Sequence, residues 1–196
     1  MDEIVLRAMA RWPNVPSVYG WLSLDRRGQW RIKGELINNP MFNSYIGRNY
    51  LCDAQGRWYF QNGPQRVFVQ LEYTPMIARL EGQADSALRF CWHTGRVVES
   101  LDGVWVDETG ALLIACEGIA ALISDRDLES ALTLIEEENG ASASDTLLEA
   151  LVDRRAILFF RYRGARYPID PIRSADTPGR FGFIENPRPA ADEPDC

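Results

Sequence analysis

Cys91 and His93 are the residue types of a nucleophile and its base, and His93 is the only histidine in the chain. A nucleophilic cysteine needs a base within hydrogen-bond reach, usually oriented by a third group. If this segment is a strand, the two Cβ atoms stand about 6–7 Å apart, because a strand rises about 3.3 Å per residue. That geometry is poor for a catalytic dyad. An enzyme using Cys91 or His93 is therefore an alternative hypothesis, and a half-buried strand is the preferred interpretation.

Other catalytic or metal-binding patterns are missing from the sequence. The acids at 125–127 and 136–138 lie at the ends of a predicted helix, where a solvated surface explains them. No GxSxG, P-loop, GxGxxG or HExxH motif occurs. The four cysteines form no CxxC pair and stand at Cys52, Cys91, Cys116 and Cys196. We therefore predict no catalytic residue, no metal site and no cofactor.

Residues 53–73, DAQGRWYFQNGPQRVFVQLEY, indicate recognition chemistry instead. Turn signals at 53–56 and 62–64 bound alternating apolar and polar residues, the pattern of two paired strands with one buried face. The apolar side chains on that face include Trp58, Phe60, Val67 and Val69. This alternation forces a second set of side chains onto the opposite face.

The opposite face of this hairpin carries Arg57, Tyr59, Arg66 and Phe68. Arginine and aromatic residues are enriched at recognition hot spots, so we predict that this face binds a small anionic ligand or a partner segment. Alternatively, a helix covers the face and both guanidiniums lie at its rim. Binding of single-stranded nucleic acid by stacking on Tyr59 and Phe68 is a further alternative. The net charge of −7 disfavours it.

One turn phrase occurs twice and suggests an internal repeat. Residues 25–30 and 53–58 both have Asp, then Gly three residues later and Trp five residues later, and residues 101–105 are a looser echo. Each copy predicts a turn that leads Trp30 or Trp58 onto a new strand, so we expect a repeated hairpin-helix-hairpin unit. The alternative is that ordinary turn chemistry recurs by chance.

The sequence pattern predicts the helices and strands that position these residues, and together they indicate an α+β fold with about four helices. Helical spacing and caps predict helices at 2–12, 39–50, 124–139 and 145–154. Predicted strands occupy 18–24, 29–33, 76–80, 88–92, 97–101, 104–107, 112–116, 157–162 and 167–169, besides the hairpin at 53–73. The connections are too short for crossovers, which favours antiparallel hairpins and a meander. We expect units at 1–75 and 76–174 and a flexible tail at 175–196.

Composition places the chain among cytoplasmic globular proteins. At 196 residues it can bury a core, and no apolar run approaches the roughly 18 residues of a membrane span. The start, MDEIVLRAMARW, does not have the pattern of a secretory signal. Scattered cysteines favour a reducing compartment. We expect no membrane contact, and a small ligand or a protein as the partner.

Three stretches also carry a resemblance: RWPNVPSVYGWLSLD, GRWYFQNGPQRVFV and the LEYTP that follows. Together they resemble an uncharacterised proteobacterial family of about this length, a domain of unknown function. More distantly, residues 20–75 are similar to a bacterial family with repeated α+β motifs and a guessed signalling role. The distant resemblance implies only a signalling role, and neither resemblance transfers a catalytic residue.

Overall fold

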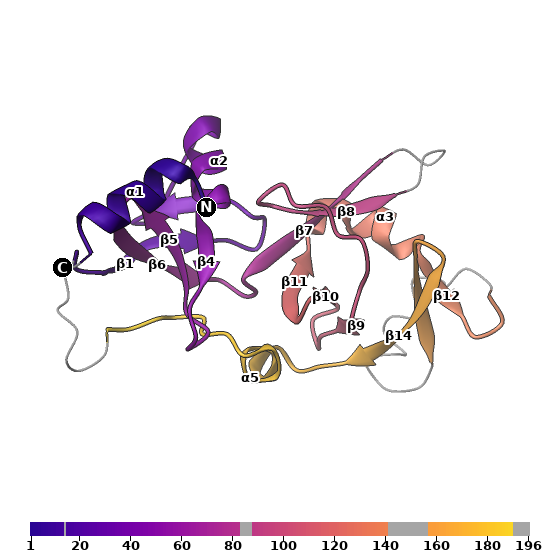
Figure 1. Cartoon of the computed structure of the whole chain (residues 1–196). Helices are drawn as coiled ribbons and strands as arrows, with labels where there is room; N and C mark the ends of the chain where they lie inside the picture. Colours follow the sequence, from indigo (N-terminus) through magenta and orange to yellow (C-terminus); the bar gives the residue numbers. More distant parts are fainter. Residues whose placement is uncertain (14, 83–87, 141–156, 190–196) are drawn as a thin grey trace. The chain divides into compact units, whose positions relative to one another are not determined.

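The computed structural model describes residues 1–13, 15–82, 88–140 and 157–189 (Figure 1). The chain divides into two compact units, Met1–Pro75 with Gly182–Cys196, and Met76–Phe181, which we call unit 1 and unit 2. The chain therefore leaves unit 1 after Pro75 and returns to it at Gly182. Among the described residues, every helix is too short or too polar to span a bilayer.

Unit 1 contains one mixed sheet and two helices, α1 (Glu3–Arg11) and α2 (Pro40–Arg48). The sheet order is β3-β2-β1-β6-β5-β4, with β1 parallel to β6 and all other neighbours antiparallel. Its strands are β1 (Val18–Leu24), β2 (Trp30–Ile32), β3 (Glu35–Leu36), β4 (Tyr50–Cys52), β5 (Trp58–Asn62) and β6 (Gln65–Leu71). Both predicted helices and both predicted hairpins of this region are confirmed.

Local sequence explains where α2 begins and which face of the sheet it covers. The Asn39 side chain accepts hydrogen bonds from the N–H groups of Met41 and Phe42, and Pro40 takes the first helical position, where its missing N–H costs nothing. Phe42 and Tyr45 then pack edge-on against Phe60 of β5, with ring centroids 6.2 and 5.3 Å apart. The helix thus covers the face that carries Phe60.

Trp30 and Trp58 take equivalent positions, as the repeated turn phrase predicts. Each is buried and begins the second strand of its hairpin, β2 or β5. Both rings contact the ring of Tyr50, with centroids 5.0 and 4.8 Å away. The two turns therefore deliver their tryptophans to one cluster in unit 1.

The segment that returns to unit 1 is hydrogen-bonded to it. The Ile184 N–H donates to Gly56 O at 2.9 Å, and the Leu71 N–H donates to Glu185 O at 2.7 Å. Phe183, which directly precedes Ile184, is 5% exposed. The sequence predicts a loosely held tail over 175–196. In the part described, to residue 189, these backbone bonds and the burial of Phe183 connect the segment to unit 1.

Unit 2 contains the second mixed sheet, of order β12-β13-β14-β9-β10-β11-β7-β8. Its strands are β7 (Met76–Glu81), β8 (Arg89–Trp92), β9 (Gly103–Val106), β10 (Leu112–Cys116), β11 (Ile119–Ile123), β12 (Ile135–Glu137), β13 (Leu158–Tyr162) and β14 (Ala165–Pro171). Two short helices, α3 (Leu128–Leu132) and α5 (Thr177–Phe181), bring the described α-helices to four. Single 3-10 turns at Asp125–Asp127 and Ser174–Asp176 precede them.

The α+β class is confirmed, but three strand pairs are parallel and not antiparallel: β1 with β6, β11 with β7, and β14 with β9. Short connections exclude a parallel crossover only between consecutive strands. Each of these pairs joins strands that are separated by several other elements in the sequence. The other strand pairs are antiparallel, as predicted, and the three parallel pairs were missed because the prediction considered neighbours in sequence alone.

Three element predictions in unit 2 also need correction. Residues 97–101 form no strand, and Val97 makes an isolated bridge to Cys91. The strand β11 is missing from the sequence prediction. The helix predicted from Ser124 ends early, and Ile135 pairs with Phe160 of β13 instead. Burial of Ile135 to 1% exposure in that pairing outweighs helical spacing. The helix predicted at 145–154 lies outside the described residues.

Candidate functional site

Arg57, the first of the predicted recognition residues, lies in a polar network. Its Nε donates to Asp53 Oδ2 at 2.8 Å, and its Nη1 donates to the Tyr19 hydroxyl at 3.3 Å. Its Cζ lies 4.5 Å from the centroid of the Phe68 ring. The side chain is only 12% exposed. The positive charge of Arg57 is therefore compensated inside unit 1.

Tyr59 and Phe68 are buried, at 8% and 1% exposure. Phe68 stacks on Tyr19 with ring centroids 4.6 Å apart, and Leu51 packs against this cluster. Arg66 is exposed, and its Cζ lies 4.9 Å from the centroid of the Tyr59 ring. The hairpin thus has two buried faces and not the single one predicted. Of the four predicted residues, Arg66 alone is exposed.

Cys91 and His93 make separate contacts. The Cys91 thiol donates to Glu81 Oε2 at 3.2 Å, and His93 Nδ1 accepts from the Ile77 N–H at 3.2 Å. Burial and the Glu81 carboxylate raise the pKa of the Cys91 thiol, whereas a nucleophile needs a thiolate. Among the described residues, no three His, Cys, Asp or Glu side chains group closely enough to hold a metal ion. The surroundings of Cys91 favour a structural thiol.

A groove of about 390 Å³ opens in unit 1, where α2 lies over the sheet. Its walls come from α2 and four strands and combine apolar side chains with two amides: Val18, Trp21, Leu22, Ile32, Phe42, Ile46, Phe60, Asn62, Gln65 and Val67. Small-molecule sites are mostly apolar hollows of about 300–1,000 Å³ with a few placed polar groups. The groove has the size and the lining of such a site.

A β-bulge in β1 shapes one wall of this groove. Val18 pairs with Val67 of β6, and Leu22 pairs with Val69, so three residues of β1 oppose Phe68 alone. The side chains of Val67 and Val69 share one face, because residues two apart on a strand do. Val18 and Leu22 therefore share that face too, despite the extra residues between them.

Gly20 makes the bulge possible. Its φ is 70°, a conformation that side-chain-bearing residues rarely adopt. On either side of it, Tyr19 stacks on Phe68 in the buried cluster, whereas Trp21 lines the groove and is 47% exposed. Bulges are common beside functional sites, where they re-aim a side chain. The bulge thus gives the groove its large aromatic wall.

Two amides lie at one end of the groove. β1 and β6 begin at this end of the sheet, and the antiparallel β5 finishes there. Gln65 and Asn62 are the lining residues of β6 and β5 at that end. Lys33 directly follows β2, and its Nζ lies 3.7 Å from the centroid of the Trp21 ring. The two amides therefore lie at the end where β1 begins, and the Lys33 ammonium lies beside Trp21, nearer the middle of β1.

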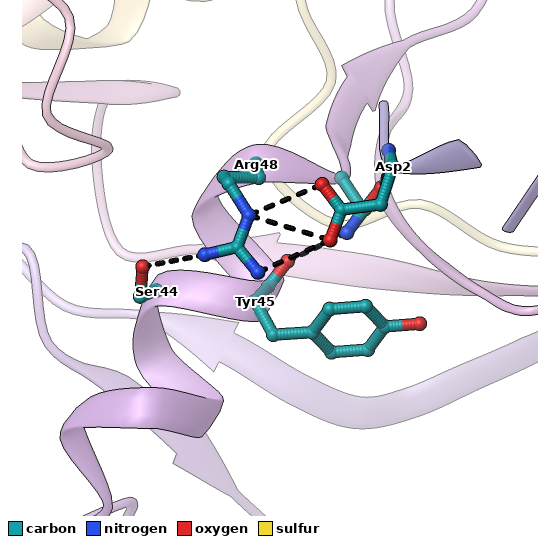
Figure 2. Close-up of polar contacts among 5 residues, drawn as sticks. Asp2, Ser44, Tyr45 and Arg48 are labelled. Carbon is teal, nitrogen blue, oxygen red and sulfur yellow. Dashed lines mark hydrogen bonds and ion pairs between the residues drawn. The ribbon is translucent and has the colours of Figure 1, made fainter. Parts of the chain in front are cut away.

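A polar cluster at the start of α1 has a structural role (Figure 2). Asp2 forms an ion pair with Arg48 at 3.1 Å, and Arg48 Nη1 donates to the Ser44 hydroxyl at 2.7 Å. The Asp2 N–H donates to Asn49 Oδ1 at 2.8 Å. The hydrogen bond from Arg48 lowers the pKa of Asp2. These contacts anchor α1 to the end of α2.

Unit 2 contains a larger hollow of about 640 Å³ near the ends of β9 and β14. The charged side chains in its wall are of both signs: Asp107, Glu108, Arg173, Asp176 and Arg180. The Glu108 carboxylate accepts the Ser174 N–H at 2.8 Å, so part of this charge is already engaged. Mixed charges of this kind select no single ligand chemistry. The groove of unit 1 is therefore the stronger candidate site.

Two mixed sheets and four short helices in the described part of the chain define an α+β fold. The family model DUF2944, described as "Protein of unknown function (DUF2946)", matches residues 1–188, and the chain belongs to this family. The resemblance to a family of unknown function is thereby confirmed.

Two solved structures are similar to this chain. A DUF1285 family protein from Silicibacter pomeroyi DSS-3 aligns with a TM-score of 0.52 and 19% identity, over 86% of this chain and 94% of that chain. A DUF1285 family protein from Shewanella baltica OS155 gives a TM-score of 0.42 and 16% identity, over 56% of this chain and 88% of that chain. The first likeness concerns the fold alone. No curated protein matches the sequence.

Proposed function

We propose that this protein is a non-enzymatic, ligand-binding regulator that takes a small apolar ligand in the groove of unit 1. The supporting observation is an open hollow of about 390 Å³ with apolar walls, beside a well-packed core. Trp21 and Ile32 in its wall are 47% and 39% exposed. Covering such surface contributes about 25 cal/mol per Å² of apolar area. A ligand that fills the groove therefore gains affinity from burial.

Two further observations support the proposal. The surroundings of Cys91 and His93 favour a non-enzymatic protein, and the free thiols favour a cytoplasmic one. The raised pKa of Cys91 and the separate contacts of His93 favour binding over catalysis. Cys52, Cys91 and Cys116 are free thiols, in keeping with a reducing compartment such as the cytoplasm. These observations support a cytoplasmic sensor of a small molecule.

The predicted role of Arg57, Tyr59, Arg66 and Phe68 in binding an anion or a partner stays a prediction. Tyr59 and Phe68 are buried, and Arg57 is ion-paired with Asp53. Of the four residues, only Arg66 is exposed to a ligand. A nucleic-acid base needs an exposed ring for stacking, and Tyr59 and Phe68 do not provide one. The apolar groove supports a binding function better than this face does.

Filling the groove tests the proposal. Val67 lines the hollow and is half-buried, so Val67→Phe places the larger ring in open space. We expect the free energy of unfolding of the variant to stay within about 1 kcal/mol of the wild-type value, because no packed neighbour is displaced. Binding of a neutral apolar fluorophore, 1-aminoanthracene, should weaken at least about tenfold, a loss of about 1.4 kcal/mol. Urea denaturation measures the stability, and fluorescence titration measures the binding.

Val69→Phe is the matched control, because Val69 lies on the same strand and the same face but is fully buried. Overpacking there should cost about 1–3 kcal/mol of unfolding free energy. If Val67→Phe binds the fluorophore as tightly as the wild type, the groove is not the binding site.

A further inference from the structure

We propose that the natural ligand of the groove is a small amphipathic anion, an aliphatic or aromatic body with one carboxylate, and that Lys33 pairs with the carboxylate. This inference rests on the proposed function, because it names the chemical class of ligand for the same groove. It depends on where the structure places the single lysine of the chain.

The backbone fixes Lys33 beside the groove. Its N–H donates to Trp21 O at 2.8 Å, so Lys33 lies opposite Trp21 across the hairpin of β1 and β2. Lys33 and Gly34 have φ of 48° and 86°, the left-handed pair of a tight hairpin turn. Its Nζ lies 3.7 Å from the centroid of the Trp21 ring, which lines the groove. The ammonium is therefore held on the groove wall.

The charge of Lys33 is available to a ligand. Within the described ranges, Lys33 forms no ion pair with an acid. The nearby Arg31 is engaged, because its Nε pairs with Asp25 at 3.1 Å and its Nη1 donates to Gly34 O at 3.1 Å. The side chains that line the groove are all uncharged. A ligand with an anionic end thus meets one unpaired cation at the edge of an apolar hollow.

The burial of the walls agrees with this orientation. Ile46, Leu22 and Phe60 in the walls are buried, whereas Lys33 lies beside the exposed ring of Trp21. An amphipathic ligand therefore fits with its apolar body along the buried walls and its carboxylate at the Lys33 end. A neutral apolar ligand would leave that end without a partner for the cation.

Paired probes test the inference. Octanoate and octanol share an apolar chain and differ in charge, so amide NMR titrations of the full chain with each separate burial from ion pairing. In the wild type we expect both to shift groove amides such as Val18, Trp21 and Val67, and octanoate to bind more tightly. Lys33→Gln should weaken octanoate about three- to fivefold, as for an exposed ion pair, and leave octanol unchanged. Arg11→Gln is the control, because Arg11 also lies over a tryptophan ring, 4.6 Å from that of Trp12, outside the groove.

The outcomes distinguish the two proposals. If both probes bind but Lys33→Gln leaves octanoate affinity unchanged, or octanol binds more tightly than octanoate, the anion inference is wrong and the apolar groove stands. If neither probe shifts groove amides, the proposed function fails and the inference fails with it. If Arg11→Gln weakens octanoate binding as much as Lys33→Gln does, the effect comes from the net charge of the protein. That result would overturn the role of Lys33.

Discussion

Three aspartates close hairpins in the same way: Asp25, Asp53 and Asp107. Each Oδ1 accepts the N–H groups two and four residues later, at 2.8–3.0 Å. Each backbone carbonyl also accepts the N–H of the glycine three residues later. The third turn therefore begins at Asp107, and not within the looser echo at 101–105. An aspartate with glycine three residues later thus pairs four backbone groups within the turn, three N–H groups and the carbonyl of the aspartate. This local pairing explains why the phrase recurs.

The carboxylate of Asp53 gives a pH-dependent prediction. Burial alone would raise its pKa, but hydrogen bonds from the Arg57 side chain and from the N–H groups of Arg57 and Gln55 hold the pKa below its usual range. Its contribution to stability is therefore complete above the unfolded pKa of about 3.9 and is lost as pH falls through the folded value. Asp53→Asn should lower the unfolding free energy by about 1–3 kcal/mol at pH 7. The difference should shrink under acid.

Urea denaturation at pH 7 and at about pH 2.5, below the ordinary Asp pKa of about 3.9, measures this difference. Asp170→Asn is a control at an exposed carboxylate, and surface changes of this kind usually stay within about 0.5 kcal/mol. A penalty for Asp53→Asn that is equal at both pH values would show that shape, and not charge, sets the contribution of Asp53.

At the scale of elements, close backbone contact decides how the C-terminal segment packs on the turn before β5. Gly56 has φ of 80°, and a Cβ built there would lie 2.1 Å from Gly182 O. The turn therefore needs glycine for two reasons, its left-handed conformation and its contact with the returning chain. Sequence pattern reveals only the first of these.

Gly56→Ala should destabilise unit 1 by about 3–4 kcal/mol, because strain and a backbone clash add. Gly34→Ala in the same unit is the matched control. Its φ is 86° and nothing lies within 4 Å of the added Cβ, so only the cost of the left-handed conformation, about 1–2 kcal/mol, is expected. Thermal and urea unfolding compare the variants. Equal losses would mean that the contact with Gly182 contributes nothing.

At the scale of the whole molecule, unit 1 is assembled from both ends of the chain. The Leu71 N–H donates to Glu185 O, whereas the Glu72 N–H donates to Leu24 O at 3.0 Å within the sheet. Removing residues 182–196 takes the acceptor away from Leu71 and leaves that of Glu72. Hydrogen exchange should therefore show Leu71 protected in the full chain and faster after truncation, with Glu72 as the internal control. Unchanged protection of Leu71 would mean that the segment does not dock in solution.

The sequence by itself determined the local structure of this protein. Turn residues, caps and alternation predict the hairpins of unit 1, the start of α2 and the equivalence of Trp30 and Trp58, because these signals act between residues a few positions apart. The same reasoning placed Phe60 and Val67 on a buried face. It could not show that a groove remains there, since an unfilled volume depends on how α2 lies over the sheet.

Tertiary structure decided everything that depends on distant partners. The parallel pairs, the strand at Ile135 and the docking of residues 182–186 all require contacts between segments far apart in sequence, which no local period encodes. The same holds for the predicted recognition face, where Tyr19 from β1 stacks on Phe68 of β6. Alternation fixes which side chains share a face. Whether that face meets solvent, a ligand or another part of the chain is set by the packing of the whole unit.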